Sequence, residues 1–282
     1  MGPRGFSWDN AADNYDSFVM CELEDTATYL DLIGIEPDDT VLDVCCGPGR
    51  IAMLAAERAK SVTGIDLYPK MLEHARANVE ARGLANVTFQ QIDWNCVLPG
   101  QNVAVHDIVI AARNLAMFDV GKLSALARKT VMIQIFADAP SIPMLQGVLF
   151  SGCEDEEGRP AFGGPGGPGG QGGPVPGPGG PPMRPRESTS TGGRASSAYF
   201  DLFTKAYNAG YDPNVRIMPE RFRKSFATRE EAYAWVCSLR PAQAAGNEER
   251  VAANAAPFIS DTRDGVEFCI ATKAAIIWWD VR

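Results

Sequence analysis

The stretch VLDVCCGPGRIA, Val41 to Ala52, decides the fold class. It begins as an apolar run typical of a buried strand and passes directly into a glycine loop and a helix-forming segment. A strand, a glycine loop and a helix in this order form the first unit of a sheet that binds a nucleotide at the loop. The glycines alone are compatible with more than one nucleotide.

The same alternation of strand and helix continues to about residue 137. Short apolar or β-branched runs without polar alternation predict parallel strands covered on both faces, at 40–45, 61–67, 86–93, 106–112 and 130–136. Helices are predicted between them, at 49–59, 69–82 and 120–129. This order predicts an α/β fold of the Rossmann-like, doubly wound type with a mostly parallel sheet. Residues 8–33 predict a helical cap at the open end of that sheet.

The composition changes abruptly after Cys153. Of the 28 residues from Gly158 to Pro185, 21 are Gly or Pro, which predicts a disordered insertion. Beyond it we expect a helix at 197–211, a strand at 214–222, a helix capped by Thr228, a weaker helix near 246–255, and either two strands or one long bent strand at the end. A late antiparallel strand would then complete the sheet. The predicted division is a helical cap (1–39), a nucleotide-binding core (40–153), the insertion (154–197) and a C-terminal part of the same domain (198–282).

Charge and composition limit the function classes. A net charge of −9 and a pI near 4.9 argue against a protein that binds the phosphate backbone of nucleic acids, so no nucleic-acid partner is expected. The N-terminus lacks the apolar core of a signal peptide and no 18-residue apolar run occurs, so we expect a cytoplasmic protein without a membrane partner. Seven cysteines without C-x-x-C spacing and only two histidines predict free thiols and no metal site.

Three features favour a single adenosine with an amino-acid tail over a dinucleotide. Asp43 precedes the glycines, where a carboxylate repels a pyrophosphate and attracts an ammonium group. The third strand ends in Asp93 and Trp94, an acceptor for an exocyclic amine and a ring on which adenine can stack. The sheet also returns to a C-terminal strand instead of leading into a separate substrate domain. The dinucleotide pattern nevertheless remains formally present, since Asp66 follows Gly49 by 17 residues.

These motifs resemble those of class I S-adenosylmethionine (SAM)-dependent methyltransferases. VLDVCCGPGR resembles the first motif of that family, VTGIDLYPKML the second and VTFQQIDWN the third, while HDIVIAARNLAMF stands at the fourth strand and its loop. The resemblance covers about residues 8–140. It implies SAM as cofactor and methyl transfer to a small molecule whose identity the sequence does not specify.

The resemblance also implies roles for individual residues. The methionine part of SAM would lie against the loop residues Asp43, Cys45, Gly47 and Gly49, and the ribose against Asp66 at the end of the second strand. Adenine would lie against Leu67, Asp93 and Trp94. The methyl group would lie near Asn114 at the end of the fourth strand, and Tyr15 would be the N-terminal aromatic residue that closes over the cofactor. No catalytic residue is assigned. A carboxylate such as Asp66 can accept from both ribose hydroxyls.

Two departures from the family pattern are visible. Cys45 stands where the family has glycine, which we expect to be tolerated only with a negative φ and room for the side chain. The fourth motif, ARNLAMF, lacks the Asn/Asp-Pro-Pro-Tyr/Phe sequence of methylators of base amino groups, so methylation of DNA adenine or of protein glutamine is not expected. The alternatives are a non-catalytic SAM-binding module that recruits a partner through its Gly/Pro arm, and an NAD-dependent oxidoreductase.

Overall fold

The computed structural model describes residues 8–137, 146–153 and 198–281. Its eight-stranded sheet has the order β3-β2-β1-β4-β5-β8-β6, and β7 pairs with β8. The first five strands are parallel, whereas β8 runs antiparallel to both β5 and β6. The strands are β1 (Thr40–Val44), β2 (Ser61–Asp66), β3 (Val87–Gln91), β4 (His106–Ala112), β5 (Ala127–Phe136), β6 (Asn214–Phe226), β7 (Ile259–Thr262) and β8 (Gly265–Asp280). The predicted fold class, including its late antiparallel strand, is confirmed.

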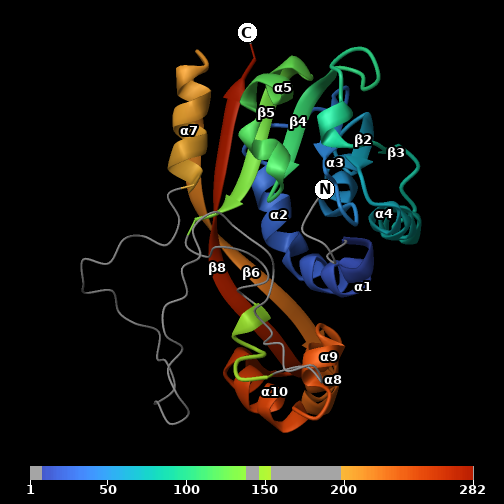
Figure 1. Cartoon of the computed structure of the whole chain (residues 1–282), viewed down its shortest axis with the longest axis vertical. Helices are drawn as coiled ribbons and strands as arrows, with labels where there is room; N and C mark the ends of the chain where they lie inside the picture. The colour runs from blue at the N-terminus through green and yellow to red at the C-terminus, as the bar shows by residue number, and fades with distance from the viewer. Residues whose placement is uncertain (1–7, 138–145, 154–197, 282) are drawn as a thin grey trace, which may run out of the picture.

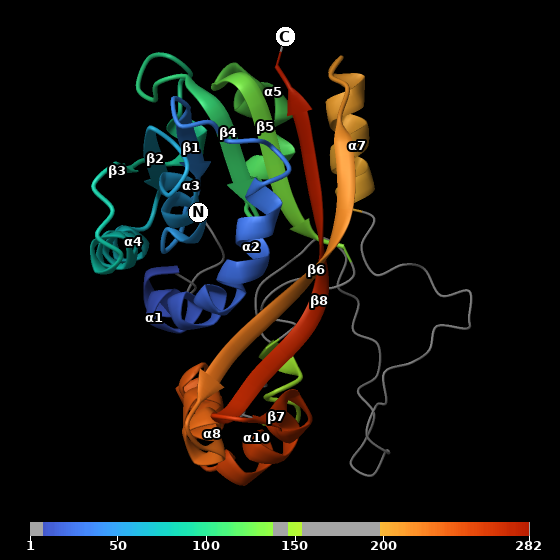
Figure 2. The same ribbon diagram turned by 180° about the vertical axis from the view of Figure 1, so that it is seen from behind.

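Helices cover both faces of the sheet and its carboxyl edge (Figure 1). They are α1 (Trp8–Val19), α2 (Leu23–Leu30), α3 (Arg50–Ala56), α4 (Pro69–Ala81), α5 (Val120–Ala125), α7 (Ala198–Asn208), α8 (Arg229–Ser238), α9 (Pro241–Ala244) and α10 (Glu248–Ala255), with 3-10 turns η1 (Met20–Glu22), η2 (Trp94–Cys96), η3 (Leu115–Phe118) and η4 (Ala256–Phe258). The arrowhead of β4 ends beside α2, and α1 lies beyond it (Figure 2). The expected N-terminal helices therefore lie at the edge where open parallel sheets bind ligands. Among the described helices, none combines the length and apolarity that a membrane crossing requires.

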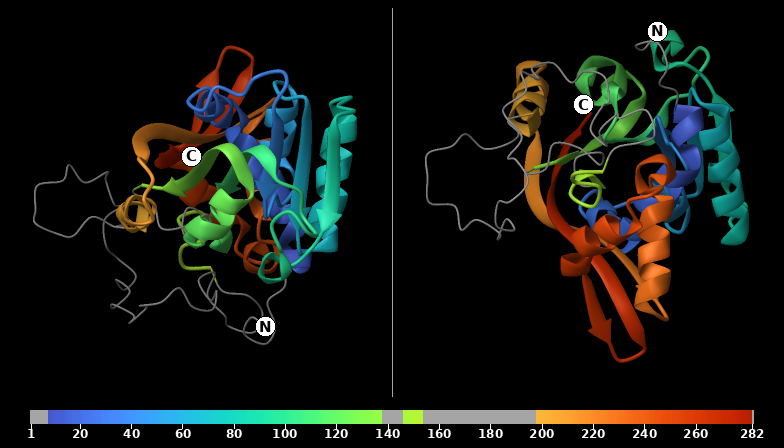
Figure 3. Two further views of the ribbon diagram at one scale, coloured as in Figure 1. Left: turned by 90° about the horizontal axis from the view of Figure 1, so that it is seen from above. Right: turned by 60° about the horizontal axis from the view of Figure 1, so that its bottom comes forward.

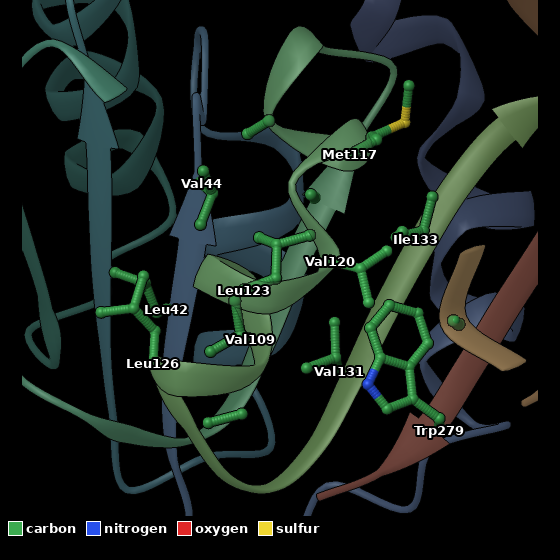
Figure 4. Close-up of a cluster of buried hydrophobic side chains, with 14 of the residues drawn as sticks. Leu42, Val44, Val109, Met117, Val120, Leu123, Leu126, Val131, Ile133 and Trp279 are labelled. Atoms are coloured by element: carbon green, nitrogen blue, oxygen red, sulfur yellow. The ribbon is translucent and has the colours of Figure 1, made fainter. Parts of the chain in front are cut away.

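Alternate residues of the central strands belong to two separate hydrophobic clusters, because successive side chains of a strand point to opposite faces of the sheet. Leu42 and Val109 face α5, where Trp279 of β8 completes the cluster (Figure 4). Val41 and Ile108 face α2 and α3. Trp279 is fully buried and donates from Nε1 to Ser124 Oγ at 3.0 Å. The C-terminal apolar run therefore serves the core.

Strands β6 and β8 continue past the other strands and carry a further cluster at their far end (Figures 2 and 3). They pair from Asn214 with Trp278 to Phe226 with Val266, and α8, α9 and α10 pack around this ribbon. Phe18 of α1 joins the same cluster, with its ring stacked 4.6 Å from that of Phe222. The extension thus meets the N-terminal helices directly above the carboxyl edge of the sheet.

The observed boundaries differ from the predicted ones in several places. The helix expected at 120–129 ends at Ala125, because Ala127 already pairs with His106 and begins β5. The strand expected at 214–222 extends to Phe226, and of the two alternatives for the final segment the structure has one continuous strand. Thr228 caps α8 as predicted, accepting from the Glu231 N–H. The Gly/Pro-rich insertion lies outside the described residues, and the division into 1–39, 40–153, 154–197 and 198–282 stays a prediction.

Candidate active site

The glycine loop after β1 is held in place by the carboxylate at the end of β2. Asp66 accepts the Gly47 N–H and the Tyr68 N–H, each at 2.9 Å. Gly47 and Gly49 have φ of +53° and +82°, a backbone conformation that glycine adopts without strain. Sequence reasoning gave Asp66 a ligand-binding role, and the structure adds that it anchors the loop that lines the site.

Asp43 lies beneath this loop and is 1% exposed. Its Oδ2 accepts the Ala52 N–H of α3 at 3.0 Å. Burial raises the pKa of Asp43 to about 7, although the positive charge of Arg50 opposes the shift. A cationic group placed beside this carboxyl would favour its ionised form, so ligand charge and Asp43 ionisation are coupled.

A narrow cavity of about 30 Å³ joins the predicted cofactor residues Tyr15, Asp43, Cys45 and Gly47 to Pro48, Arg50 and Ala112. Tyr15 lies over the loop, since a Cβ on Gly47 would be 3.7 Å from the ring atom Cε1 of Tyr15. A space of this size corresponds to about one water molecule. Entry of an amino-acid tail therefore requires the residues around the cavity, among them Tyr15, to rearrange.

Helix α1 carries Tyr15 and is attached to α4 by polar contacts. His74 Nε2 lies 2.7 Å from Asp13 Oδ1, and Asn78 donates to Asp16 at 2.8 Å. Asn78 also donates to the Pro48 carbonyl of the loop at 3.0 Å. These polar contacts lie near the protein surface, whereas Phe18 anchors the end of α1 in the buried cluster around Phe222.

Cys45 contradicts the expectation that it has a negative φ. Its φ is +50°, in the left-handed region that disfavours residues with a Cβ. The side chain is half-buried, and burial followed by the charges of Asp66, Asp43 and Asp93 raises the pKa of Cys45 to about 12. The thiol is therefore neutral, and the acids at the ends of three adjacent strands all act on it.

Replacing Cys45 by glycine should raise the free energy of unfolding by about 0.5–1 kcal/mol, because relief of the positive φ outweighs the backbone entropy that glycine adds. Urea unfolding of Cys45→Gly and Cys45→Ala measures this, with the alanine variant as the control that keeps the Cβ. A glycine variant less stable than the alanine variant would contradict the strain argument.

Asn114 is placed as predicted, at the carboxyl ends of β1 and β4. Its amide donates to the Val44 carbonyl at 2.7 Å, while its Oδ1 is buried and has no partner among the described residues. The backbone of Arg113, the preceding residue, has a φ of +53°. Buried acceptors without a partner are rare, which marks Asn114 Oδ1 as a contact for a ligand or an ordered water.

The remaining predicted residues do not line the cavity. Gly49 starts α3 and packs on α4, where a Cβ would be 3.1 Å from Ala75 Cβ. Leu67 is 42% exposed beside the loop. Asp93 caps η2 by accepting the Asn95 N–H at 2.8 Å. The ammonium of Lys122 sits 4.8 Å from the Trp94 ring centroid, so part of that ring already has a partner.

A buried charged cluster beside the cavity escaped the sequence analysis. Arg113 donates to Glu22, Arg50 lies 3.3 Å from Glu22, and Gln134 bridges Arg50 and Glu220 at 3.0 and 2.6 Å. The two glutamates and Gln134 are at most 1% exposed. One signal was available, since Gln134 interrupts the apolar strand TVMIQIF. The other members come from four separate segments, and no sequence pattern links them.

Fold and site together define a Rossmann-like α/β protein whose glycine loop is flanked by carboxylates at adjacent strand ends. Residues 41–132 match the family model of the methyltransferase domain. The chain thus carries a domain of the class I SAM-dependent methyltransferase family, whose cofactor is SAM.

Similar proteins agree with this domain assignment. The chain is 42% identical over 69 residues to the 23S rRNA (uracil(1939)-C(5))-methyltransferase RlmD of Photobacterium angustum, covering 24% of this chain and 30% of that protein. It is 39% identical over 70 residues to an uncharacterized RNA methyltransferase of Oceanobacillus iheyensis, covering 25% and 15%. The chain thus matches less than a third of the length of these relatives. The crystal structure of the YcgJ protein of Bacillus subtilis shares the fold, with a TM-score of 0.50 at 15% identity, over 92% of this chain and 99% of that one.

Proposed function

We propose that this protein transfers a methyl group from SAM to a small-molecule acceptor. The observation that carries the proposal is the position of two carboxylates at the glycine loop: Asp66 accepts the Gly47 N–H, and buried Asp43 lines the cavity with Cys45 and Gly47. A dinucleotide would bring a pyrophosphate against these acids, whereas the cofactor of a methyltransferase brings an ammonium group and a sulfonium.

The chemical groups present fit SAM. Buried Asp43 suits the ammonium of the methionine part, and the half-exposed turn of Cys45 and Gly47 offers its backbone to the same part. Each oxygen of Asp66 accepts one N–H, which leaves lone pairs for ribose hydroxyls. The unpartnered Asn114 Oδ1 suits the methyl end.

The adenine end is assigned to exposed residues beyond the cavity. Leu67 offers an apolar surface, and Asp93 and Trp94 offer an acceptor and an aromatic ring. Gly49 keeps α3 in position, and Tyr15 covers the methionine part. The residues thus extend from the buried carboxyl under the loop to the surface at the end of β3.

SAM supplies a methyl group already activated by its sulfonium. The chain then has to orient the acceptor in line with that methyl and exclude water. Tyr15 and α1 provide a cover for the cavity, and the cluster of Arg113, Glu22 and Glu220 provides polar groups on the acceptor side.

A net charge of −9 supports a small molecule over RNA, although the relatives described above include RNA methyltransferases. Incubation with methyl-labelled SAM and a cell extract, split into RNA and small-molecule fractions, tests the choice. We expect label in the small-molecule fraction. Label that is lost on ribonuclease treatment would show that the acceptor is RNA. Binding of S-adenosylhomocysteine without any methyl transfer would favour a non-catalytic module.

The affinity for S-adenosylhomocysteine should depend on pH through Asp43. Only the ionised carboxylate attracts the ligand ammonium, and the pKa of Asp43 is raised to about 7, so the affinity should be constant above pH 7 and fall about tenfold per pH unit below it. Calorimetric titrations between about pH 5.5 and 8 measure this. Asp43→Asn should bind weakly at every pH with a flat profile, and a wild-type profile equally flat would contradict the assignment.

A further inference from the structure

Four buried side-chain atoms in the described residues have no hydrogen-bond partner, and all belong to one place. They are Glu22 Oε2, Arg113 Nη1, Asn114 Oδ1 and Glu220 Oε2. Arg113 pairs with Glu22, lies 3.9 Å from Glu220 and directly precedes Asn114. With a proton on Glu220, its carboxyl and that of Glu22 form a hydrogen bond, which partners those two oxygens in that state. Arg113 Nη1 and Asn114 Oδ1 stay without a partner among the described residues, at a cost of about 1–3 kcal/mol each, and they indicate a site that takes a polar ligand.

Glu220 lies above the carboxyl edge of the sheet, on the extension of β6. Phe136, the last residue of β5, pairs with Ala274 of β8, which also pairs with Met218 of β6. Glu220 follows Met218 by two residues along β6. Gln134 donates to Glu220 at 2.6 Å and accepts from Arg50 at 3.0 Å, and Arg50 lines the cavity under the glycine loop. Two hydrogen bonds therefore connect Glu220 to the SAM cavity.

The backbone at Arg113 is strained in a way that aims its side chain into this cluster. Its φ is +53°, and its guanidinium lies 4.7 Å from the Phe136 ring centroid and 5.7 Å from that of Phe222. Left-handed backbone at a residue with a Cβ costs about 1–3 kcal/mol and is concentrated at functional sites. The strain and the aromatic contacts hold Nη2 of Arg113 beside the two glutamates, while its Nη1 has no partner among the described residues.

Charged and titratable groups surround Glu220 from every side of the cluster. Glu22 of η1, Arg50 of α3, Arg113 after β4 and Tyr29 of α2 all interact with it electrostatically. Burial and the neighbouring Glu22, which acts through its charge and a side-chain hydrogen bond, raise the pKa of Glu220 to about 8, although Arg113 and Arg50 oppose the shift. Glu220 is therefore only partly ionised near neutral pH, and its ionised form can take a proton from a reacting group.

We propose that Glu220 accepts the proton that the methyl acceptor loses, and that the acceptor is a neutral molecule reacting through an O–H or N–H group. This inference rests on the proposed function. A lone pair of the oxygen or nitrogen forms the bond to the methyl carbon as the carbon–sulfur bond breaks, with its electron pair going to sulfur. The proton of that oxygen or nitrogen passes to Glu220 Oε2, giving S-adenosylhomocysteine, the methylated product and a neutral carboxyl.

The cluster also indicates what surrounds the reacting atom. Arg113 Nη1 can donate to an acceptor group of the molecule, while Asn114 Oδ1 and Glu22 Oε2 can accept from its donors. When Glu220 is ionised, the two arginines and two glutamates balance in formal charge, so a neutral polar molecule enters that state without leaving an uncompensated charge. A small molecule with several hydroxyl or amine groups fits this arrangement.

The SAM analogue sinefungin tests the inference without the unknown acceptor. In sinefungin a carbon bearing an ammonium group stands where SAM has its methylated sulfonium. That ammonium should contact Glu220 and Asn114, whereas S-adenosylhomocysteine has no group there. We expect the wild type to bind sinefungin more tightly than S-adenosylhomocysteine, and Glu220→Gln to lower this affinity ratio about tenfold or more while leaving S-adenosylhomocysteine affinity unchanged. Glu249→Gln, at an exposed position of α10, is the matched control and should keep the wild-type ratio.

An unchanged ratio in a folded Glu220→Gln would overturn the inference alone, whereas a wild type that binds neither ligand would overturn the proposed function and the inference with it. A measurement on the wild type covers the case of a variant that does not fold. Titrations at pH 8 in buffers of different ionisation enthalpy should show about half a proton more released by sinefungin than by S-adenosylhomocysteine, since the ammonium drives ionisation of Glu220. Equal proton release would overturn the inference.

Discussion

Replacing Asp66 by alanine should lower the affinity for S-adenosylhomocysteine by a factor of about one hundred or more. The carboxylate holds the Gly47 and Tyr68 N–H groups and is proposed to accept from the ribose hydroxyls. Hydrogen bonds to a charged group contribute about 1.5–3 kcal/mol each, so two ligand bonds and a loosened loop account for a loss of this size. Calorimetric titration measures it.

Two further variants separate the roles of Asp66. Asp66→Asn keeps one acceptor oxygen and should retain part of the affinity, whereas Asp201→Ala, at an exposed position of α7, should bind as the wild type does. An Asp66→Ala protein that is folded and binds within about threefold of the wild type would remove this residue from the cofactor site.

Replacing Arg113 by alanine should lower the free energy of unfolding by about 3–5 kcal/mol, because among the described residues Glu220 then stays buried without an ion-pair partner and Glu22 keeps only Arg50. Glu22 and Glu220 are 1% and 0% exposed, and Arg113 is the residue that lies beside both. The loss of its contacts with Phe136 and Phe222 adds to the effect. Urea unfolding followed by circular dichroism measures the change.

The matched control is Arg82→Ala, which removes an arginine from an exposed pair with Glu57. Surface pairs contribute about 0–1 kcal/mol, so this variant should remain close to the wild type. Combining Arg113→Ala with Glu220→Gln should restore part of the lost stability, since one buried charge is removed. Equal effects of Arg113→Ala and Arg82→Ala would contradict the account of the buried cluster.

The sequence was sufficient for the fold because its signals are local. Each strand of the core is a short apolar run followed by a glycine or polar turn, and right-handed crossovers then restrict the strand order. The extent of the pairing of β6 with β8 was harder to predict from the sequence. Its length depends on the helices α8 to α10 packing around the far end, which no local pattern of residues 214–226 reveals.

The candidate site was only partly predictable for the same reason. Asp43, Gly47 and Asp66 belong to motifs that lie within 24 consecutive positions of the chain, 43 to 66, and the structure brings them together. Glu22 and Glu220 are separated by most of the chain and meet through tertiary packing. The backbone at Cys45 was predicted wrongly, because a positive φ is decided by the turn between β1 and α3 and not by the residue that occupies it.

The central claim is that the loop after β1 binds the adenosyl cofactor. Isothermal titration of the wild-type protein with S-adenosylhomocysteine tests it most directly. We expect one ligand per chain with a dissociation constant on the order of 1–100 µM, a binding free energy of about 5.5–8 kcal/mol in magnitude. A folded wild-type protein that gives no binding heat at ligand concentrations of about 1 mM, at more than one temperature, would contradict it.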